Sequence, residues 1–571
     1  MRPLDWSVLI LATVGIVVYG VWKGRGDRDI EGYLLSNRSL PWYAVALSVM
    51  ATQASAATFL TMPGQAYAEG VAWVQFYFGL PLAVVVLSVT AIPLYRRLNV
   101  YTAYEFLEER LDLKTRALAV FLFLIQRALA AGLTIFTPAL VISTILGLDI
   151  LVTNIAVGVL VIIYTTFGGS RAVSWTQFHQ MIIILFGITI SFVLVVRQMP
   201  EHVSLLDATR LAGSLGRLEA VNFSFDLTER YTIWSGLIGG FFLQMAYFGT
   251  DQSQVQRVLN ARSIRESRLG LLFNGLVKIP MQFFILFLGA MVLVFYQFVE
   301  PPIFFNQVPT QAVRSGPDAA EFADVERRYA LDFENKRGEV EVLLQAIEAG
   351  DDGARGAARE RVRAAEEQML STRDEGIELM QRIDPGMDTN DANYVFLGWV
   401  MDFLPTGLVG LILAAIMFAS MSSAASELNA LASTTVVDIY KRAIKPEASD
   451  KHYLLVAKLS TVIWGIYAIF FGQFLSRLGT IVVAVNIVGS IFYGTVLGIF
   501  LVAFYSKRIS GTAVFMGALI AEVAVIACYF FTEISFLWYN LVGCVLTVLV
   551  AALLQIFLPP KQDRGGVGAA A

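Results

Sequence analysis

About thirteen apolar stretches, each long enough to cross a lipid bilayer, follow one another along this chain of 571 residues. A helix needs ~20 apolar residues to span ~30 Å of hydrocarbon, and here short polar joints separate the stretches. Charged residues make up only 15% of the chain, against about 25% in an ordinary soluble domain. The sequence therefore predicts an all-α polytopic membrane protein.

The apolar stretches divide the chain into a membrane domain and one interruption. We expect residues 1–299 to hold the first eight spans, residues 394–558 the last five, and residues 559–571 a cytoplasmic tail. The expected spans lie near residues 5–23, 41–67, 71–95, 117–147, 149–167, 172–197, 231–256, 267–299, 394–440, 453–475, 478–505, 511–531 and 535–558.

Lysine and arginine residues gather in every second connection between these spans, and such residues mark the cytoplasmic side of a membrane. We therefore expect a multi-pass protein of the cell membrane with its N-terminus outside and its C-terminus in the cytoplasm. No small-residue cleavage site follows the first run, so we interpret it as a retained span. The basic residues of these connections are Lys23, Arg25, Arg28, Arg38, Arg96, Arg97, Arg171, Arg257, Arg262, Arg265, Arg268, Lys441, Arg442, Lys445, Lys507, Arg508, Lys561 and Arg564.

Composition argues against several other classes of protein. A net charge of −4, without a basic cluster away from the short loops, argues against nucleic-acid binding. Cys528 and Cys544 both lie inside apolar runs, where a thiol usually acts as a small hydrophobe. No motif brings a nucleophile, a base and an orienting acid together, so we do not expect an enzyme.

Residues 300–393 interrupt the membrane pattern with an acidic insertion. From Asp318 to Asp391 the chain carries 20 Asp and Glu against 10 Lys and Arg. Apolar residues recur at helical spacing on either side of a Gly-rich turn at 350–356, which predicts two antiparallel helices outside the cell. The insertion is either a solvated hairpin without chemistry or a surface for an extracytoplasmic partner or for gating.

Two spans contain polar and small residues at a depth where such residues are costly. The second span reads Ala51-Thr-Gln-Ala-Ser-Ala-Ala-Thr58, and the seventh reads Gln244-Met-Ala-Tyr-Phe-Gly-Thr-Asp-Gln252. Paired interruptions five spans apart are typical of an inverted-repeat transporter, whose unwound segments offer carbonyls and helix ends to ions and substrate. The alternative is that the small residues only allow close packing of helices.

The ninth span adds hydroxyl groups that could complete an ion site. Ser422 and Ser423 diverge by ~100° on a helix, and Ala419 lies one turn before them on the same face. Hard cations accept neutral oxygen ligands, so no carboxylate is needed for a monovalent ion. The alternative is that these serines donate to carbonyls of their own or a neighbouring helix.

These motifs resemble the sodium:solute symporter family, which includes sodium/sugar, sialic acid, iodide and monocarboxylate cotransporters. The resemblance implies a leucine-transporter-like fold, with a five-plus-five inverted repeat broken in its second and seventh spans. It also implies sodium as the coupling ion. The matching stretches begin at Ala51, Tyr164, Phe248, Ser422 and Val437 and run in the family's order.

The resemblance implies a set of sodium ligands that agrees with the helix-face argument. Some members bind a second sodium through an aspartate after a Trp-Thr pair, but here Gln177 follows that pair and Ala425 replaces a hydroxyl, although Ser426 remains. We therefore expect one sodium per transport cycle. The expected sodium ligands are the carbonyls of Ala51, Ala54 and Ala419 and the hydroxyls of Ser422 and Ser423.

The family's substrate cavity carries over to ten positions of this chain. Arg127 suits a carboxylate or pairs with a neighbouring helix, and Lys278 faces the same choice, with Asp251 as its expected partner. We interpret Glu427 and Asp438 as helix-end or interhelical partners. The expected cavity residues are Gln53, Thr58, Trp73, Tyr77, Arg127, Gln244, Tyr247, Phe248, Lys278 and Asn486.

The sequence thus predicts a sodium-coupled symporter that imports a small organic solute, with a carboxylate-bearing anion favoured if both cations open on the cavity. One sodium moved through ~100 mV with a tenfold gradient yields ~3.7 kcal/mol, enough for an accumulation of a few hundredfold. A monoanion would lose the electrical part, which keeps a sugar or polyol as the alternative. A transporter-like nutrient sensor or docking receptor is the alternative of another class.

Overall fold

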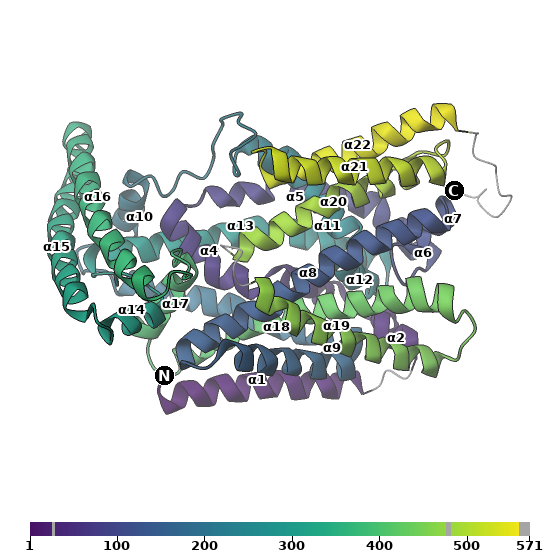
Figure 1. Ribbon diagram of the computed structural model, residues 1–571, viewed down its shortest axis with the longest axis horizontal. Coiled ribbons are helices and arrows are strands. Elements are labelled where there is room, and N and C mark those ends of the chain that lie inside the picture. Colours follow the sequence, from purple (N-terminus) through teal and green to yellow (C-terminus); the bar gives the residue numbers. More distant parts are fainter. Residues whose placement is uncertain (26–28, 476–480, 559–571) are drawn as a thin grey trace.

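The computed structural model describes residues 1–25, 29–475 and 481–558. Within these residues the regular secondary structure is helical, apart from one isolated bridge between Leu40 and Ala261. The long helices of the bundle run along the long axis of the molecule, whereas α15 and α16 run across it at one end (Figure 1). The predicted all-helical architecture is confirmed.

The helical elements follow one another in this order: α1 (Pro3–Gly24), α2 (Ile30–Leu35), η1 (Ser36–Arg38), α3 (Trp42–Gln53), α4 (Ala56–Glu69), η2 (Ala72–Tyr77), α5 (Leu80–Val89), α6 (Ala91–Leu98), α7 (Glu105–Arg110), α8 (Leu113–Leu146), α9 (Ile150–Arg197), α10 (Leu205–Ser214), η3 (Ser235–Gly239), α11 (Gly240–Gly249), α12 (Gln252–Leu259), α13 (Ile264–Phe298), α14 (Gln307–Arg314), α15 (Ala319–Ala349), α16 (Asp352–Ile383), α17 (Ala392–Phe403), α18 (Leu408–Thr434), η4 (Thr435–Ile444), α19 (Asp450–Leu475), α20 (Ile481–Tyr505), α21 (Gly511–Phe531) and α22 (Phe536–Phe557).

Ten helices of the described residues are long and apolar enough to cross a membrane, or up to eleven with one bent pair. α9 contains 48 residues and covers both the fifth and the sixth predicted spans, with its helical path broken at Gly169, where φ is 59° and ψ −170°. The seventh predicted span is divided among η3, α11 and α12. The count of thirteen crossings therefore stays a prediction, while the polytopic architecture is confirmed.

α18 is the central helix of the bundle. In the apolar stretch by which α18 could cross a membrane, 89% of the residues are buried, against 17% in that of α1. It packs against α1, α3, α4, α8, α9, α12 and α19. Because every face of α18 meets another helix, its serines and its glutamate lie inside the protein.

The acidic insertion forms two long helices, α15 and α16, which lie side by side at one end of the molecule (Figure 1). Gly350 ends α15 with φ at 68°, a left-handed conformation that suits glycine. Apolar residues at the predicted helical spacing are buried between the two helices and the segment before them: Phe322, Val325, Tyr329, Phe333, Met369, Ile377 and Met380. The domain boundaries and the extracytoplasmic position of this hairpin stay predictions.

Candidate functional site

The second span breaks where its small residues lie. Helix α3 ends at Gln53, and Ala54 (ψ 71°) and Ser55 (ψ 168°) leave the helical conformation before α4 begins at Ala56. The two halves differ in direction by 56°. A helix end leaves its last carbonyls without partners in the helix, so the break exposes backbone oxygens in the interior of the bundle.

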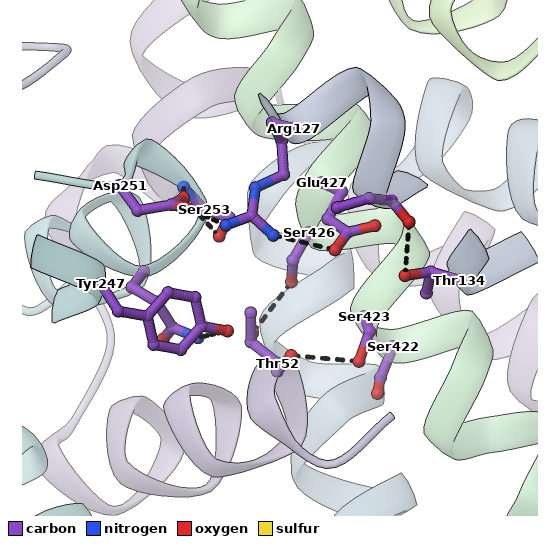
Figure 2. Close-up of polar contacts among 12 residues, drawn as sticks. Thr52, Arg127, Thr134, Tyr247, Asp251, Ser253, Ser422, Ser423, Ser426 and Glu427 are labelled. Atoms are coloured by element: carbon purple, nitrogen blue, oxygen red, sulfur yellow. Dashed lines mark hydrogen bonds and ion pairs between the residues drawn. The ribbon is translucent and has the colours of Figure 1, made fainter. Parts of the chain in front are cut away.

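The serines of α18 lie against these carbonyls. Ser422 Oγ donates to Ala51 O at 2.8 Å or to Ala419 O at 2.8 Å. Ser423 Oγ lies 3.0 Å from Thr52 O, 3.3 Å from Ala419 O and 3.5 Å from Ala51 O. Figure 2 shows Ser423 of α18 facing Thr52 near the end of α3. We call these oxygens, from Ala51, Thr52, Ala419, Ser422 and Ser423, the oxygen cluster.

The oxygen cluster contains four of the five expected sodium ligands. The carbonyl of Thr52 also belongs to the cluster, although it was not among the ligands expected from the sequence. Ala54 is buried directly after α3, but its carbonyl makes no contact with the serines among the hydrogen bonds of the described residues. The assignment of the cluster to sodium stays a prediction, since only its geometry is visible.

A second polar group lies beside the oxygen cluster and is centred on Gln177 of α9. Gln177 Nε2 donates to Thr52 Oγ1 at 3.1 Å, Ser422 O at 2.9 Å and Ser426 Oγ at 2.6 Å. Its Oε1 accepts from Ser48. An amide nitrogen thus lies beside Ser426, the hydroxyl that remains of the second ion site implied by the family resemblance.

The seventh span is also broken, but its freed carbonyls already have partners. α11 ends at Gly249, and Asp251 caps α12 by accepting from Ser253 N at 2.9 Å. Tyr95 Oη donates to Gly249 O at 2.8 Å, and Tyr104 Oη donates to Thr250 O at 2.9 Å. These carbonyls are therefore satisfied within the protein.

A cavity of about 110 Å³ lies between the broken second span, η2, α8, α11, α18 and α20. Eight of the ten expected substrate residues line it, namely Gln53, Thr58, Trp73, Tyr77, Arg127, Gln244, Tyr247 and Asn486. The lining also includes residues that the sequence analysis did not assign to the cavity: Thr52, Ser55, Phe76, Gln126, Ala130, Thr134, Thr137, Leu243, Ser423, Glu427 and Tyr493.

Phe248 and Lys278 are the two expected residues that lie outside the cavity lining. Phe248 follows Tyr247 on α11, and a rotation of ~100° per residue turns it away from the cavity. Lys278 of α13 is fully buried, and its Nζ lies 5.1 Å from the centre of the Tyr77 ring, without a hydrogen-bond partner in the described residues. The expected pairing of Lys278 with Asp251 is wrong, because Asp251 pairs with Arg127 instead.

Arg127 lies between two carboxylates, as Figure 2 shows. Its Nη1 donates to Glu427 Oε1 at 3.0 Å, and its Nη2 donates to Asp251 Oδ2 and, at 2.6 Å, to Tyr493 Oη. Tyr493 Oη in turn donates to Asp251 Oδ2 at 2.8 Å. Arg127 is thus held by neighbouring helices, which is the interhelical alternative left open above, and its guanidinium still lines the cavity.

The model of the sodium:solute symporter family matches residues 33–320 and 384–521 of this chain, which is more than half of it. Residues 321–383 fall between the two matched segments, and they include all but the first two residues of α15 and the whole of α16. The hairpin is therefore an addition to the part of the chain that the family model describes.

Several characterised proteins are similar to this chain. The sodium/sialic acid symporter SiaT of Proteus mirabilis is 24% identical over 571 residues, covering 98% of this chain and 96% of that protein. The human sodium/iodide cotransporter is 29% identical and human sodium-coupled monocarboxylate transporter 1 is 31% identical, each over 47% of this chain. The chain spans less than half the length of these two relatives, at 41% and 43%.

A solved structure of a Na⁺-coupled sialic acid symporter in a substrate-bound, outward-open state matches with a TM-score of 0.76. The match has 20% sequence identity and covers 98% of this chain and 99% of the other. At that identity the likeness shows a shared fold, and the family match identifies a secondary transporter rather than an enzyme. The chain therefore belongs to the sodium:solute symporter family and is a sodium-coupled symporter with multiple membrane-spanning helices.

Proposed function

We propose that this protein uses one sodium ion, held by the oxygen cluster, to drive the import of a small carboxylate-bearing solute bound in the adjacent cavity. The observation that carries the proposal is that Thr52 and Ser423 belong both to the oxygen cluster and to the cavity wall. An ion at the cluster would hold the broken second span against α18 and so fix one wall of the solute cavity. Rocking of the repeats would then expose both ligands inward.

A carboxylate on the solute is supported by two observations. Arg127 places a guanidinium at the wall of the cavity, and its Nε has no hydrogen-bond partner within the part of the chain that the structure describes. The names of two similar proteins, a sialic acid symporter and a monocarboxylate transporter, are those of acid carriers.

A sugar or polyol is the second candidate, and the neutral polar groups of the cavity favour it. Gln53 and Gln244 line the cavity, and the Oε1 atom of each is buried without a partner in the described residues. Such oxygens would accept hydrogen bonds from hydroxyl groups of a neutral solute.

The orientation of the protein is also part of the proposal, with the N-terminus outside and the C-terminus in the cytoplasm. Figure 1 shows α1 beginning at the end of the bundle that carries the hairpin and α22 ending at the opposite end. The predicted cytoplasmic connections meet one another: Arg38 donates to Asn99 O at 3.1 Å, and Lys441 lies 5.8 Å from the Tyr101 ring centre. Arg257 is the exception, since it is fully buried in α12.

Labelling of single cysteines tests this orientation. In a background with Cys528→Ala and Cys544→Ala, we expect a membrane-impermeant maleimide added to intact cells to label Gly353→Cys in the hairpin. The matched variant Ser449→Cys, before α19, should react only after the cells are permeabilised. The reverse pattern would contradict the proposed orientation.

Uptake into proteoliposomes tests the function itself. Radiolabelled monocarboxylates, sialic acid, sugars and polyols would be offered under an inward sodium gradient and, as the control, under an equal potassium gradient. The proposal predicts accumulation of a carboxylate-bearing solute only with sodium. Solute binding that is independent of sodium and gives no flux would contradict it and favour a sensor or docking receptor.

A further inference from the structure

Glu427 offers an unpaired carboxylate oxygen to the cavity. Its side chain is 7% exposed and lies on α18, one turn after Ser423. Oε1 accepts from Arg127, but Oε2 is buried without a hydrogen-bond partner in the described residues. A buried, unpaired carboxylate oxygen is costly, so a ligand that donates to it gains more than an ordinary hydrogen bond.

The charges around Glu427 leave one negative charge uncompensated. Among the described residues, Arg127 alone forms an ion pair with Glu427, and Arg127 is shared with Asp251. Both carboxylate oxygens of Asp251 already accept hydrogen bonds. Its Oδ1 accepts from Ser253, and its Oδ2 accepts from Arg127 and Tyr493. The nearby cation Lys278 lies against the Tyr77 ring and outside the cavity lining.

Aromatic side chains form another part of the cavity wall. Trp73 and Phe76 of η2 are stacked, with ring centres 4.8 Å apart and planes 14° apart, and both line the cavity. Tyr247 also lines the cavity. Aromatic faces attract a desolvated cation, and Trp does so best. The wall therefore favours a positively charged group within the cavity that Glu427 also lines.

We infer that the solute also carries a positively charged nitrogen, recognised by Glu427 Oε2 and the aromatic wall, and is therefore a zwitterion. This inference rests on the proposed function and names its substrate class. Arg127 then has two roles, since it faces the solute carboxylate at the cavity wall and also holds Glu427 in place through Oε1. A zwitterion has no net charge, so import with one sodium keeps the full electrical driving force that a monoanion would lose.

Matched sets of solutes test the inference. The twenty amino acids, 4-aminobutyrate and glycine betaine would each be compared with the corresponding acid without the amine and the corresponding amine without the acid. The readouts are sodium-driven uptake into proteoliposomes and a sodium-dependent shift in thermal stability of the purified protein. We expect at least one zwitterion to exceed both of its single-charge analogues by about tenfold or more.

The variant Glu427→Gln removes the negative charge and keeps the shape of the side chain. We expect it to lose about tenfold or more in apparent affinity for the zwitterion, while its sodium affinity in the absence of solute stays within about threefold. Glu427→Asp should keep part of the preference for the zwitterion. Glu522→Gln of α21 is the matched control, since Glu522 is buried but does not line the cavity.

The outcomes separate this inference from the proposed function. Sodium-driven uptake of acids that is indifferent to the amine, or a Glu427→Gln variant with an unchanged preference for the zwitterion, would overturn the inference alone. A Glu427→Gln variant that loses a second sodium ion and keeps the zwitterion would likewise overturn it. Absence of sodium-driven uptake for every zwitterion, acid and neutral solute would overturn the proposed function and the inference together.

Discussion

At the scale of single residues, Gln177 is the side chain that we propose limits the site to one ion. Its amide nitrogen donates to three oxygens, from Thr52, Ser422 and Ser426, at 2.6 to 3.1 Å. A cation at that point would meet the hydrogens of the amide instead of a carboxylate. We therefore propose that the amide takes the place of a second ion beside the oxygen cluster, so that one sodium is bound per cycle.

Replacing the amide of Gln177 by a carboxylate and adding a hydroxyl at position 425 should therefore create a second sodium site. We expect the double variant Gln177→Asp with Ala425→Ser to bind two sodium ions, because it gains a carboxylate and a hydroxyl next to Ser426. Sodium-dependent uptake should then rise with a Hill coefficient near two instead of one. Gln177→Asn, which keeps a neutral amide, is the control, and a coefficient that stays near one in the double variant would contradict the interpretation.

The sequence predicted the oxygen cluster better than it predicted the charged groups. Ser422 and Ser423 are neighbours on one helix, so their divergence follows from the helix geometry alone. The partners of Arg127 come from α12 and α18, far away in the chain, and no local spacing relates them. Phe248 could have been excluded, because a residue adjacent to Tyr247 on the same helix points elsewhere.

At the scale of elements, α4 is held by backbone contacts on two sides. A methyl group at Gly64 would overlap the carbonyl oxygen of Ala392 in α17, and one at Gly289 of α13 would overlap the carbonyl oxygen of Pro63. Small residues let backbones approach in this way. The position of α4, which carries Thr58 at the cavity wall, therefore depends on these glycines.

Gly64→Ala should push α4 away from α17. We expect a loss of about 1–3 kcal/mol in stability, the usual cost of overpacking, together with weaker solute binding because Thr58 moves. The melting temperature of the purified protein and its uptake rate measure the two effects. Gly15→Ala on α1, where the added methyl meets nothing within 4 Å, should change neither; equal behaviour of the two variants would contradict the packing argument.

The hairpin carries one costly residue, Lys336 of α15. Burial lowers the pKa of Lys336 below its ordinary value of 10.5, although Glu366 opposes the shift. The unfolded chain then binds more protons than the folded one between the lowered pKa and 10.5, so stability rises as pH rises through that window. Its Nζ lies 5.9 Å from the Phe333 ring centre.

Lys336→Met should remove this dependence. We expect the thermal midpoint of the variant to exceed that of the wild type near neutral pH, by the equivalent of about 1 kcal/mol, and the difference to shrink as pH approaches 10. Arg337→Met, at an exposed position next to it, is the control. A difference in thermal midpoint between Lys336→Met and the wild type that does not vary with pH would show that the buried charge of Lys336 is not its cause.

The elements were predictable to the extent that their signals are local. Weak helix formers marked both broken spans, and the break at Ala54 and Ser55 falls inside the predicted segment. The sequence did not predict that Tyr95 and Tyr104 would satisfy the carbonyls of the second break, because these side chains come from other elements. Nor did it predict the burial of Arg257, which we placed in a cytoplasmic connection by its charge alone.

At the scale of the whole molecule, the central helix α18 contributes residues to both the oxygen cluster and the cavity wall. Ser422 and Ser423 contribute to the oxygen cluster, and Ser423 and Glu427 line the cavity on the same helix. The break in the second span faces both. In the proposed function, coupling would follow from this shared wall and would need no contact between the ion and the solute.

Sodium affinity of α18 serine variants tests this account most directly. Sodium would be titrated against purified wild type, Ser423→Ala and Ser420→Ala, with sodium-dependent thermal stability as the readout and no solute present. Ser420 is an equally buried serine of α18 whose hydroxyl donates to Thr134 O on α8, away from the cluster. We predict that Ser423→Ala loses about tenfold or more in apparent sodium affinity while Ser420→Ala keeps the wild-type value. An unchanged sodium affinity in Ser423→Ala would contradict the assignment of the oxygen cluster as the sodium site.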